Sequence, residues 1–364
     1  MNIIEATRSF EKWLKNHIKI VGHDLDYKHE QMRADPFLFF RATFYRWAQL
    51  WPDCCPRLAR GPKILAVGDL HLENFGTWRD AEGRLVWGVN DFDEAYPMAF
   101  SNDLVRLAVS ALLAAEARPH FKLKSGEVCA QLAEGYLAVL ERGGEPFVLM
   151  ESHPRLRGMA LQDLRQPASF WNRLELKSSP LKREPPDSVR KAIGKILPAG
   201  AEPEYRFLKA PKGLGSLGRQ RYLAIVSWQG GRMAREAKTV APSACLWAKG
   251  KGKRSGTGNP WLERTVRSAV RCADPYYQVK RGWLVRRLGP DCSRIDIDEL
   301  AHHEDLASLL RCMGQETANV HLGTRKGRER ILESWKHLPT DWLETAARSM
   351  LKLSLKDWNR FRAR

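Results

Sequence analysis

Two acidic motifs on either side of a predicted β-hairpin constrain this chain more than any other feature of its sequence. The first motif is GDLHLEN at 68–74, and the second is NDFDEA at 90–95. The residues between them are typical of two strands, FGTWR and RLVWGVN, joined by the turn residues DAEG. Because a hairpin returns the chain to where it began, we expect Asn74 and Asp91 at its open end, beside the loop that carries Asp69.

The side chains at this hairpin end suit magnesium and phosphate chemistry. Mg²⁺ prefers oxygen ligands and takes one or two from the protein, which makes Asn74 and Asp91 the predicted metal ligands. Asp69 is then free to align an attacking hydroxyl with the γ-phosphate of a nucleotide, as an orienting group rather than a strong base. We expect His71 to brace the loop through hydrogen bonds and Asp93 to support the metal site. The alternative is a polar turn that binds nothing.

A glycine-rich segment, GLGSLG at 213–218, is a second candidate phosphate-binding feature. A dinucleotide-binding fold would need a helix after these glycines, but RQRYLAIVSW is typical of a strand that turns at Gly230-Gly231. A strand, a glycine loop and a strand instead resemble the flap with which kinases cover the phosphates of ATP, because glycines let backbone N–H groups approach the oxygens. The alternative is a glycine-rich turn without a ligand. The predicted nucleotide contacts are Gly213, Gly215, Ser216 and Gly218.

A cation that pairs with phosphate is expected on the next strand, within RMAREAK at 232–238. Arg235 and Lys238 are the two candidates. Strand alternation places them on opposite faces, so only one of them can face a nucleotide. We favour Arg235 slightly and keep Lys238 as the alternative.

The acidic motifs resemble the catalytic loop and the metal-binding segment of the kinase-like fold, above all those of the aminoglycoside and choline phosphotransferases. The chain resembles a bacterial family, domain of unknown function 2252, more closely still. The resemblance implies that Asp103 ties down the backbone of the catalytic loop. It also implies lysine at the position of Arg235, where this chain departs from the family. The matching signatures, over roughly residues 30 to 325, are MRADPFLFFRAT, GDLHLENFG, NDFDEA, DLVRLAVS, GLGSLGRQRYL and VRRLGP.

The order of these motifs is rotated relative to that of an ordinary kinase. A kinase has its glycine flap before its catalytic loop, whereas this chain has the catalytic loop about 140 residues before the glycine segment. The cyclic order is kept if the two chain ends are joined, which predicts a circular permutation. The expected fold is therefore α+β, a two-lobed kinase-like fold with a small antiparallel sheet lobe and a mostly helical lobe that carries the catalytic hairpin.

The composition of successive segments predicts where the lobes divide. The stretch rich in Pro, Ser, Lys and Arg is expected to be a linker or an insertion, and the stretches around it to fold. The predicted division is 1–150 for the catalytic-loop part of the helical lobe, 151–203 for the linker or insertion, 204–290 for the nucleotide-binding β lobe, and 291–364 for C-terminal helices that complete the helical lobe.

The charge balance indicates the kind of partner. Sixty Lys and Arg residues against 42 Asp and Glu residues give a net charge of +18, which favours polyanions such as nucleotides or nucleic acid. The seven cysteines are scattered and form no CxxC pair, so neither a disulfide framework nor a zinc site is indicated. No apolar run approaches the roughly 20 residues that cross a bilayer, and no secretory signal pattern is present. We expect a cytoplasmic protein without a transmembrane segment, and the sequence does not indicate its oligomeric state.

These features rank three functions. The leading hypothesis is an ATP- and Mg²⁺-dependent phosphotransferase that acts on a hydroxyl acceptor, either a small molecule or a protein. A nucleotidyl transferase that donates AMP would use the same residues. The third hypothesis is a non-catalytic pseudokinase, or a basic adaptor that binds nucleic acid through its positive charge.

Overall fold

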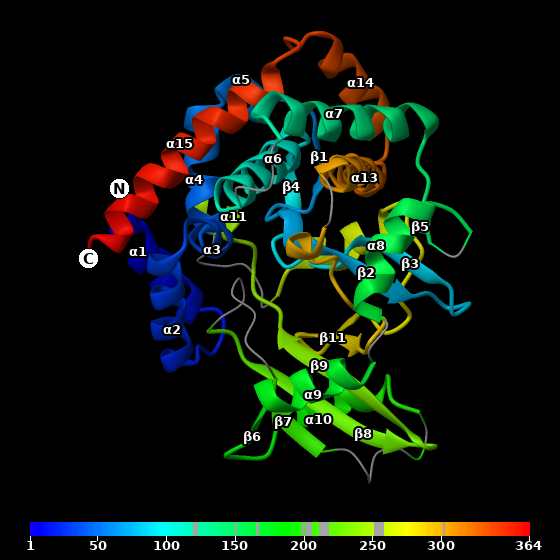
Figure 1. Cartoon of the computed structure of the whole chain (residues 1–364). Helices are drawn as coiled ribbons and strands as arrows, with labels where there is room; N and C mark the ends of the chain where they lie inside the picture. Colours follow the sequence, from blue (N-terminus) through cyan, green and yellow to red (C-terminus); the bar gives the residue numbers. More distant parts are fainter. Residues whose placement is uncertain are drawn as a thin grey trace.

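The computed structural model has mixed α+β architecture, as expected, with a helical part and a strand-rich part that adjoin (Figure 1). In the description that follows, the helical part comprises the elements before residue 150 and after residue 300, and the sheet part comprises the strands β6–β11 with the helices that cover them. The structure describes residues 1–118, 123–149, 151–164, 167–198, 200, 206–210, 218–250, 258–300 and 303–364.

Helices from both ends of the chain build the helical part. They are α1 (Ile3–Lys15), α2 (Gly22–Ala34), α3 (Pro36–Ala42), α4 (Phe44–Cys54), α5 (Pro56–Ala59), α6 (Ser101–Glu116), α7 (Ser125–Arg142), α13 (His303–His321), α14 (Gly327–Lys336) and α15 (Trp342–Arg362). Asp35 caps α3 as its sequence predicts, because its Oδ1 accepts a hydrogen bond from the backbone N–H of Leu38 at 2.7 Å. α6 is buried along nearly its whole length and forms the centre of the core. None of the helices within the described ranges is both long enough and apolar enough to span a bilayer.

The predicted hairpin is present beside α6. Its strands β2 (Phe75–Arg79) and β3 (Leu85–Val89) pair antiparallel, with Phe75 opposite Val89 at the open end. The short helix η1 (Leu72–Asn74) leads into β2, and the N–H of Asn90 donates to the carbonyl oxygen of Asn74 at 2.8 Å. Strand β5 (Phe147–Val148) extends this sheet, while β1 (Lys63–Ala66) pairs separately with β4 (Tyr96–Ala99).

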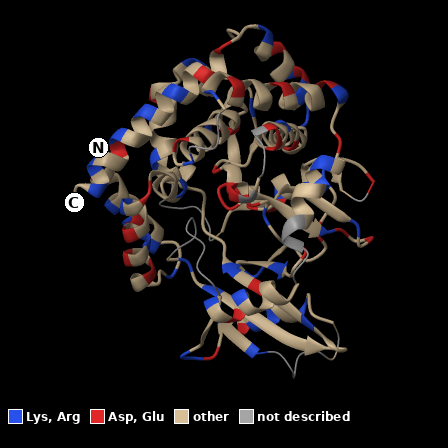
Figure 2. Ribbon diagram, viewed as in Figure 1, with Lys and Arg blue, Asp and Glu red and all other residues tan. Residues whose placement is uncertain are grey.

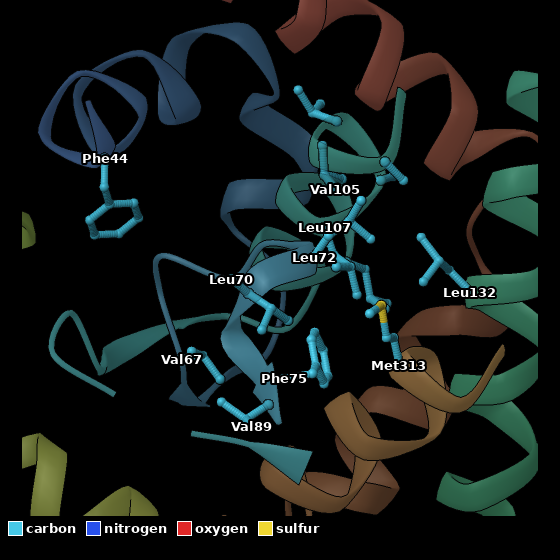
Figure 3. Packing of buried hydrophobic residues seen from close by; sticks show 14 of the residues in the cluster. Phe44, Val67, Leu70, Leu72, Phe75, Val89, Val105, Leu107, Leu132 and Met313 are labelled. Carbon is cyan, nitrogen blue, oxygen red and sulfur yellow. The ribbon is translucent and has the colours of Figure 1, made fainter. Parts of the chain in front are cut away.

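The loop before the hairpin is anchored by apolar side chains. Leu70 and Leu72 are buried between the hairpin residue Phe75 and the α6 residues Val105 and Leu107 (Figure 3). Burying a leucine side chain stabilises the fold by roughly 2 kcal/mol. The polar residues of this loop are therefore positioned by their apolar neighbours.

The sheet part is one antiparallel sheet in the order β10-β11-β9-β8-β7-β6. The turn between β8 and β9 lies one residue before the predicted Gly230-Gly231 turn, because Trp228 pairs with Gly231 and leaves Gln229 and Gly230 as the turn residues. Both have positive φ, 48° and 79°, as a tight turn of this type requires. The strands are β6 (Ser179–Pro180), β7 (Arg206–Lys209), β8 (Arg221–Trp228), β9 (Gly231–Thr239), β10 (Gln278–Lys280) and β11 (Trp283–Leu288).

The segment 151–203, expected as a linker or insertion, is largely folded. It contains α8 (Pro154–Leu164), α9 (Pro167–Lys177) and α10 (Asp187–Gly194) in addition to β6. Trp171 of α9 packs with Leu223 of β8, while Ile193 of α10 packs with Ala224, the next residue of the same strand. Since neighbouring strand residues point to opposite faces, the two helices cover opposite faces of the sheet. Between the strands and α13 lie α11 (Ala244–Ala248), α12 (Pro260–Ser268) and η4 (Ile297–Glu299).

The two ends of the described chain lie close together, because α1 packs against α15 (Figure 1). Arg46 links both ends, since it donates a hydrogen bond to the carbonyl oxygen of Met1 and forms an ion pair with Asp357 of α15 at 2.7 Å. Chain ends this close are a condition that a circular permutation has to meet.

Two glycines allow α7 and α13 to cross closely. A Cβ atom added to Gly135 of α7 would lie 2.1 Å from the carbonyl oxygen of Arg311, and one added to Gly314 of α13 would lie 2.2 Å from that of Leu132. Both contacts are with backbone atoms, which cannot move without shifting a whole helix. The position of α13 behind the hairpin therefore depends on these glycines.

We expect Gly135→Ala to lower the free energy of unfolding by about 1–3 kcal/mol, because the added methyl group overpacks the crossing. Gly158→Ala is the matched control, since Gly158 also lies in a helix but its added Cβ would meet nothing within 4 Å. That change should leave stability unchanged or raise it by up to about 1 kcal/mol. Urea denaturation of both variants measures the difference, and equal stabilities would show that the crossing is not tight.

Candidate functional site

A cavity of about 360 Å³ lies where the open end of the hairpin meets the strands β8, β9 and β11. Asp69, Asn74 and Asp91 line it from the helical part, and Arg219 and Glu236 line it from the sheet part. The convergence of the three helical-part residues, expected from the hairpin alone, is therefore present. We refer to this space as the interlobe cavity.

Asp69 is held by a buried arginine of α6. The Nε of Arg106 donates to Oδ1 of Asp69 at 2.8 Å, and an η nitrogen of Arg106 forms a second hydrogen bond to the same oxygen. The guanidinium group is stacked 4.1 Å from the ring centroid of Phe40. Burial raises the pKa of Asp69, and Arg106 opposes that rise. Because both bonds end on Oδ1, Oδ2 makes no hydrogen bond with the described residues.

The backbone of the loop is held by Asp103, as the resemblance implies. Its two carboxylate oxygens accept hydrogen bonds from the N–H groups of Val67 and Gly68 at 2.7 and 3.0 Å, and its Oδ2 also contacts His321 at 3.1 Å. Asp103 is completely buried, so these bonds satisfy a charge that would otherwise be costly. The direction in which Asp69 points is fixed through this backbone.

His71 and Asn74 brace the loop against the hairpin. The Nδ1 of His71 accepts a hydrogen bond from the N–H of Glu73 at 3.2 Å, and Oδ1 of Asn74 accepts one from the N–H of His71 at 2.7 Å. Burial, with help from Arg41 and Arg106, lowers the pKa of His71 well below its ordinary value, so its ring is neutral. Since a carbonyl oxygen has two lone pairs, Oδ1 of Asn74 keeps one for another partner.

Lys238 of β9 reaches the second acidic motif. Its Nζ lies 2.7 Å from Oδ2 of Asp93 and 3.7 Å from Oδ1 of Asp91, and only 2% of the lysine side chain is exposed. Arg219 forms a further ion pair with Asp93 at 3.0 Å. Burial alone would raise the pKa of Asp93, but Lys238 and Arg219 outweigh it and lower that pKa below its ordinary value. The carboxylate of Asp91 remains 38% exposed toward the cavity.

The same arginine continues the network to Glu94. Arg219 contacts Oε1 of Glu94 at 3.0 Å, and Oε2 of Glu94 accepts a hydrogen bond from the N–H of Ala244 at 2.7 Å. Burial raises the pKa of Glu94 to about 7 despite the arginine. The buried ionic network of Asp93, Glu94, Arg219 and Lys238 thus connects the helical part to the sheet part.

The two phosphate-binding predictions in the sheet part fare differently. Arg235 does not line the interlobe cavity: its Nε donates to the carbonyl oxygen of Ile196 at 3.1 Å, and it stacks 4.3 Å from the ring of Tyr276. The predicted alternation is correct, but the face of β9 that carries Arg235 is covered by α10 and the residues after it, so Lys238 faces the acidic motif instead. The slight preference for Arg235 is therefore not supported by its position.

Most of the glycine segment lies outside the described residues, including Gly213, Gly215 and Ser216. Gly218 is described and has a φ of +92°, and its carbonyl oxygen accepts a hydrogen bond from the N–H of Val21 at 2.8 Å. A Cβ at Gly218 would lie 2.8 Å from Leu25, so this glycine packs against α2 while Arg219, the next residue, reaches the cavity.

Several residues that line the cavity carry polar atoms which are buried and lack a hydrogen-bond partner among the described residues. They are Nε of Arg41, Nε of Arg271, the hydroxyl of Tyr277, Nε of Arg287 and Oδ1 of Asp93. Leaving such atoms unpaired costs about 1–3 kcal/mol each, which favours a cavity that is filled by a polar ligand. Sequence reasoning missed the four donors, because they come from separate segments without a motif; only Arg219 and Arg221 follow directly from the glycine signature.

The acceptor oxygens in the cavity fit magnesium. Asp91 is partly exposed, Oδ1 of Asp93 is unpaired, and Asn74 retains a lone pair. No group of three His, Cys, Asp or Glu side chains poised for a metal occurs in the described ranges, but Mg²⁺ with a nucleotide needs only one or two carboxylate or amide ligands.

Comparison with known proteins supports a bacterial family and nothing narrower. A sequence model of the family described as "Uncharacterized protein conserved in bacteria (DUF2252)" matches residues 21–160. This stretch contains both acidic motifs and Asp103 but ends before the sheet part. Searches of curated proteins and of solved structures found no match.

Glu316 of α13 holds the far side of the hairpin. Its Oε1 accepts a hydrogen bond from the N–H of Val89 at 3.1 Å, and its Oε2 accepts one from Asn319 at 3.1 Å. Arg271 donates to the carbonyl oxygen of Val89 at 2.8 Å, two residues before Asp91. Burial raises the pKa of Glu316 to about 7, although Arg271 opposes the rise.

This pKa predicts how stability depends on pH. Glu316 binds its proton more tightly in the folded chain than in the unfolded one, so its contribution is full below about pH 4.5 and is lost as the pH rises through about 7. Between pH 5 and pH 8 the wild type should lose on the order of 3 kcal/mol more unfolding free energy than Glu316→Gln does. Urea denaturation at both pH values measures this, with Glu333→Gln as an exposed control. Parallel pH profiles for wild type and Glu316→Gln would contradict the assignment.

Proposed function

We propose that this chain is an ATP- and Mg²⁺-dependent phosphotransferase of kinase-like fold that phosphorylates a hydroxyl group. The observation that carries the proposal is the interlobe cavity itself. Asp69, Asn74 and Asp91 meet there with Lys238 and Arg219, which come from a separate sheet more than 120 positions along the chain. Phosphoryl transfer needs this combination of an orienting carboxylate, metal ligands and cations for phosphate.

The arrangement of the sheet part supports the kinase-like interpretation. The glycine segment connects β7 to β8, and the next strand, β9, carries Lys238. In protein kinases the lysine that pairs with phosphate lies on the third strand, after the glycine-rich loop and its second strand. The adjacent chain ends are consistent with the circular permutation that this interpretation requires.

The metal would be held by Asn74 and Asp91, with Asp93 beside them. When bound, Mg²⁺ with the nucleotide neutralises charge on the transferred phosphoryl group. Lys238, placed between Asp91 and Asp93, keeps these carboxylates ionised and lies where it can also attract phosphate oxygens. Arg219 adds positive charge on the same wall.

Asp69 is assigned the acceptor hydroxyl. Arg106 occupies Oδ1 and leaves Oδ2 to accept the hydrogen bond of that hydroxyl. In the transfer, the acceptor oxygen forms a bond to the γ-phosphorus, the bond from this phosphorus to ADP breaks with its electron pair leaving on ADP, and the hydroxyl proton passes to Oδ2. Orientation of this kind contributes about 10²–10⁴-fold to the rate of a proton-coupled step.

Two substitutions separate binding from chemistry. Asp91→Ala should weaken binding of Mg²⁺-ADP by more than about tenfold, because a ligand to the metal is lost. Asp69→Asn should bind Mg²⁺-ADP as the wild type does, yet lose about 10²–10⁴-fold in ATP turnover. Calorimetric titration and release of labelled phosphate measure the two effects, with the exposed Asp187→Asn as the control.

Full turnover in Asp69→Asn would contradict the role of Asp69, and no binding of Mg²⁺-ADP to the wild type would contradict the proposed function altogether. The position of the label decides between the two kinds of transfer. Transfer from γ-labelled ATP supports phosphotransfer, whereas transfer from α-labelled ATP would assign nucleotidyl transfer to the same residues.

A further inference from the structure

A second cavity of about 530 Å³ adjoins the interlobe cavity. The two cavities share Glu73, Cys292 and Arg294 in their walls. Glu73 lies four residues after Asp69 in the same loop, so the second cavity opens beside the carboxylate that is assigned the acceptor hydroxyl. A molecule in the second cavity could therefore extend one end toward Asp69.

The second cavity has an apolar wall and a cationic wall. Phe37 and Ile297 are buried apolar residues that line it. α9 contributes Phe170 and Leu174 together with Arg173 and Lys177, which share one helix face because they are three or four residues apart. The cavity thus offers an apolar surface beside two positive charges that are one helical turn apart.

These two cations are available for a ligand. Neither Arg173 nor Lys177 forms an ion pair with an acid in the described part of the chain. The acids that face the cavity are already engaged by partners of their own. Arg41 and Arg294 pair with Glu73, Arg118 pairs with Asp298, and Oδ1 of Asp296 accepts a hydrogen bond from the N–H of Asp298 at 2.9 Å.

We propose that the second cavity binds the acceptor substrate, and that this substrate is a small organic anion with an apolar body. Its acidic group, a carboxylate or a phosphate, lies against Arg173 and Lys177, its apolar body lies against Phe37 and Phe170, and its hydroxyl reaches Asp69 past Glu73. A cationic or purely polar acceptor does not match these walls. The proposal rests on the proposed function for the identity of the reaction, but the binding site itself can be tested without a nucleotide.

The test uses 1-naphthyl phosphate as an apolar anion and 1-naphthylmethylamine as its cationic counterpart. Calorimetric titration of the full chain should show binding of the anion at one site and at least tenfold weaker binding of the amine. The double variant R173Q/K177Q should bind the anion at least tenfold more weakly than the wild type. Both residues are exposed, so the variant is expected to fold.

The control variant K182Q/R183Q removes the same charge from two exposed residues of the same part of the chain that do not line the cavity. It should bind the anion as tightly as the wild type. The proposal is overturned if the wild type does not bind the anion, if the amine binds equally well, or if R173Q/K177Q binds like the control. A parallel titration with Mg²⁺-ADP keeps the two claims separate, because its failure contradicts the nucleotide site and leaves the outcome at the second cavity unaffected.

Discussion

The buried ionic network of Asp93, Glu94, Arg219 and Lys238 is the interaction on which the rest of the structure depends. Its members come from the two parts of the chain, and between 2% and 8% of the surface of Lys238, Glu94 and Arg219 is exposed. A buried charge that loses its partner costs about 3–5 kcal/mol, so the sheet part is restricted to positions in which these pairs remain closed. The interlobe cavity, with its acids on one wall and its arginines on the other, is a consequence of this docking.

The part of the site that the sequence predicted is the part that local geometry determines. A hairpin with a short turn brings its two ends together whatever surrounds it, so Asn74 and Asp91 could be placed beside Asp69 without knowledge of the fold. The choice between Arg235 and Lys238 could not be made in the same way. Alternation separates their faces, but which face meets the acids depends on α10, which covers the opposite one.

Other features depend on packing between distant segments. Arg41, Arg271 and Tyr277 line the interlobe cavity from separate elements, and no spacing in the sequence connects them. The segment 151–203 resembles a linker by composition, yet short apolar faces on α9 and α10 are sufficient to cover the sheet. The net charge of +18 is spread over helices and strands alike (Figure 2), so it indicates no single binding face and says less about function than the arginines within the two cavities do.

The central claim is that the interlobe cavity binds a divalent cation together with a nucleotide. Electron paramagnetic resonance of Mn²⁺, a substitute for Mg²⁺, tests it directly because only the free ion gives the sharp six-line signal. We predict that the wild-type chain removes one equivalent of free Mn²⁺ when ADP is present and far less with adenosine, which has no phosphates. Equal uptake of Mn²⁺ with ADP and with adenosine, or no uptake beyond that by ADP alone, would contradict the account.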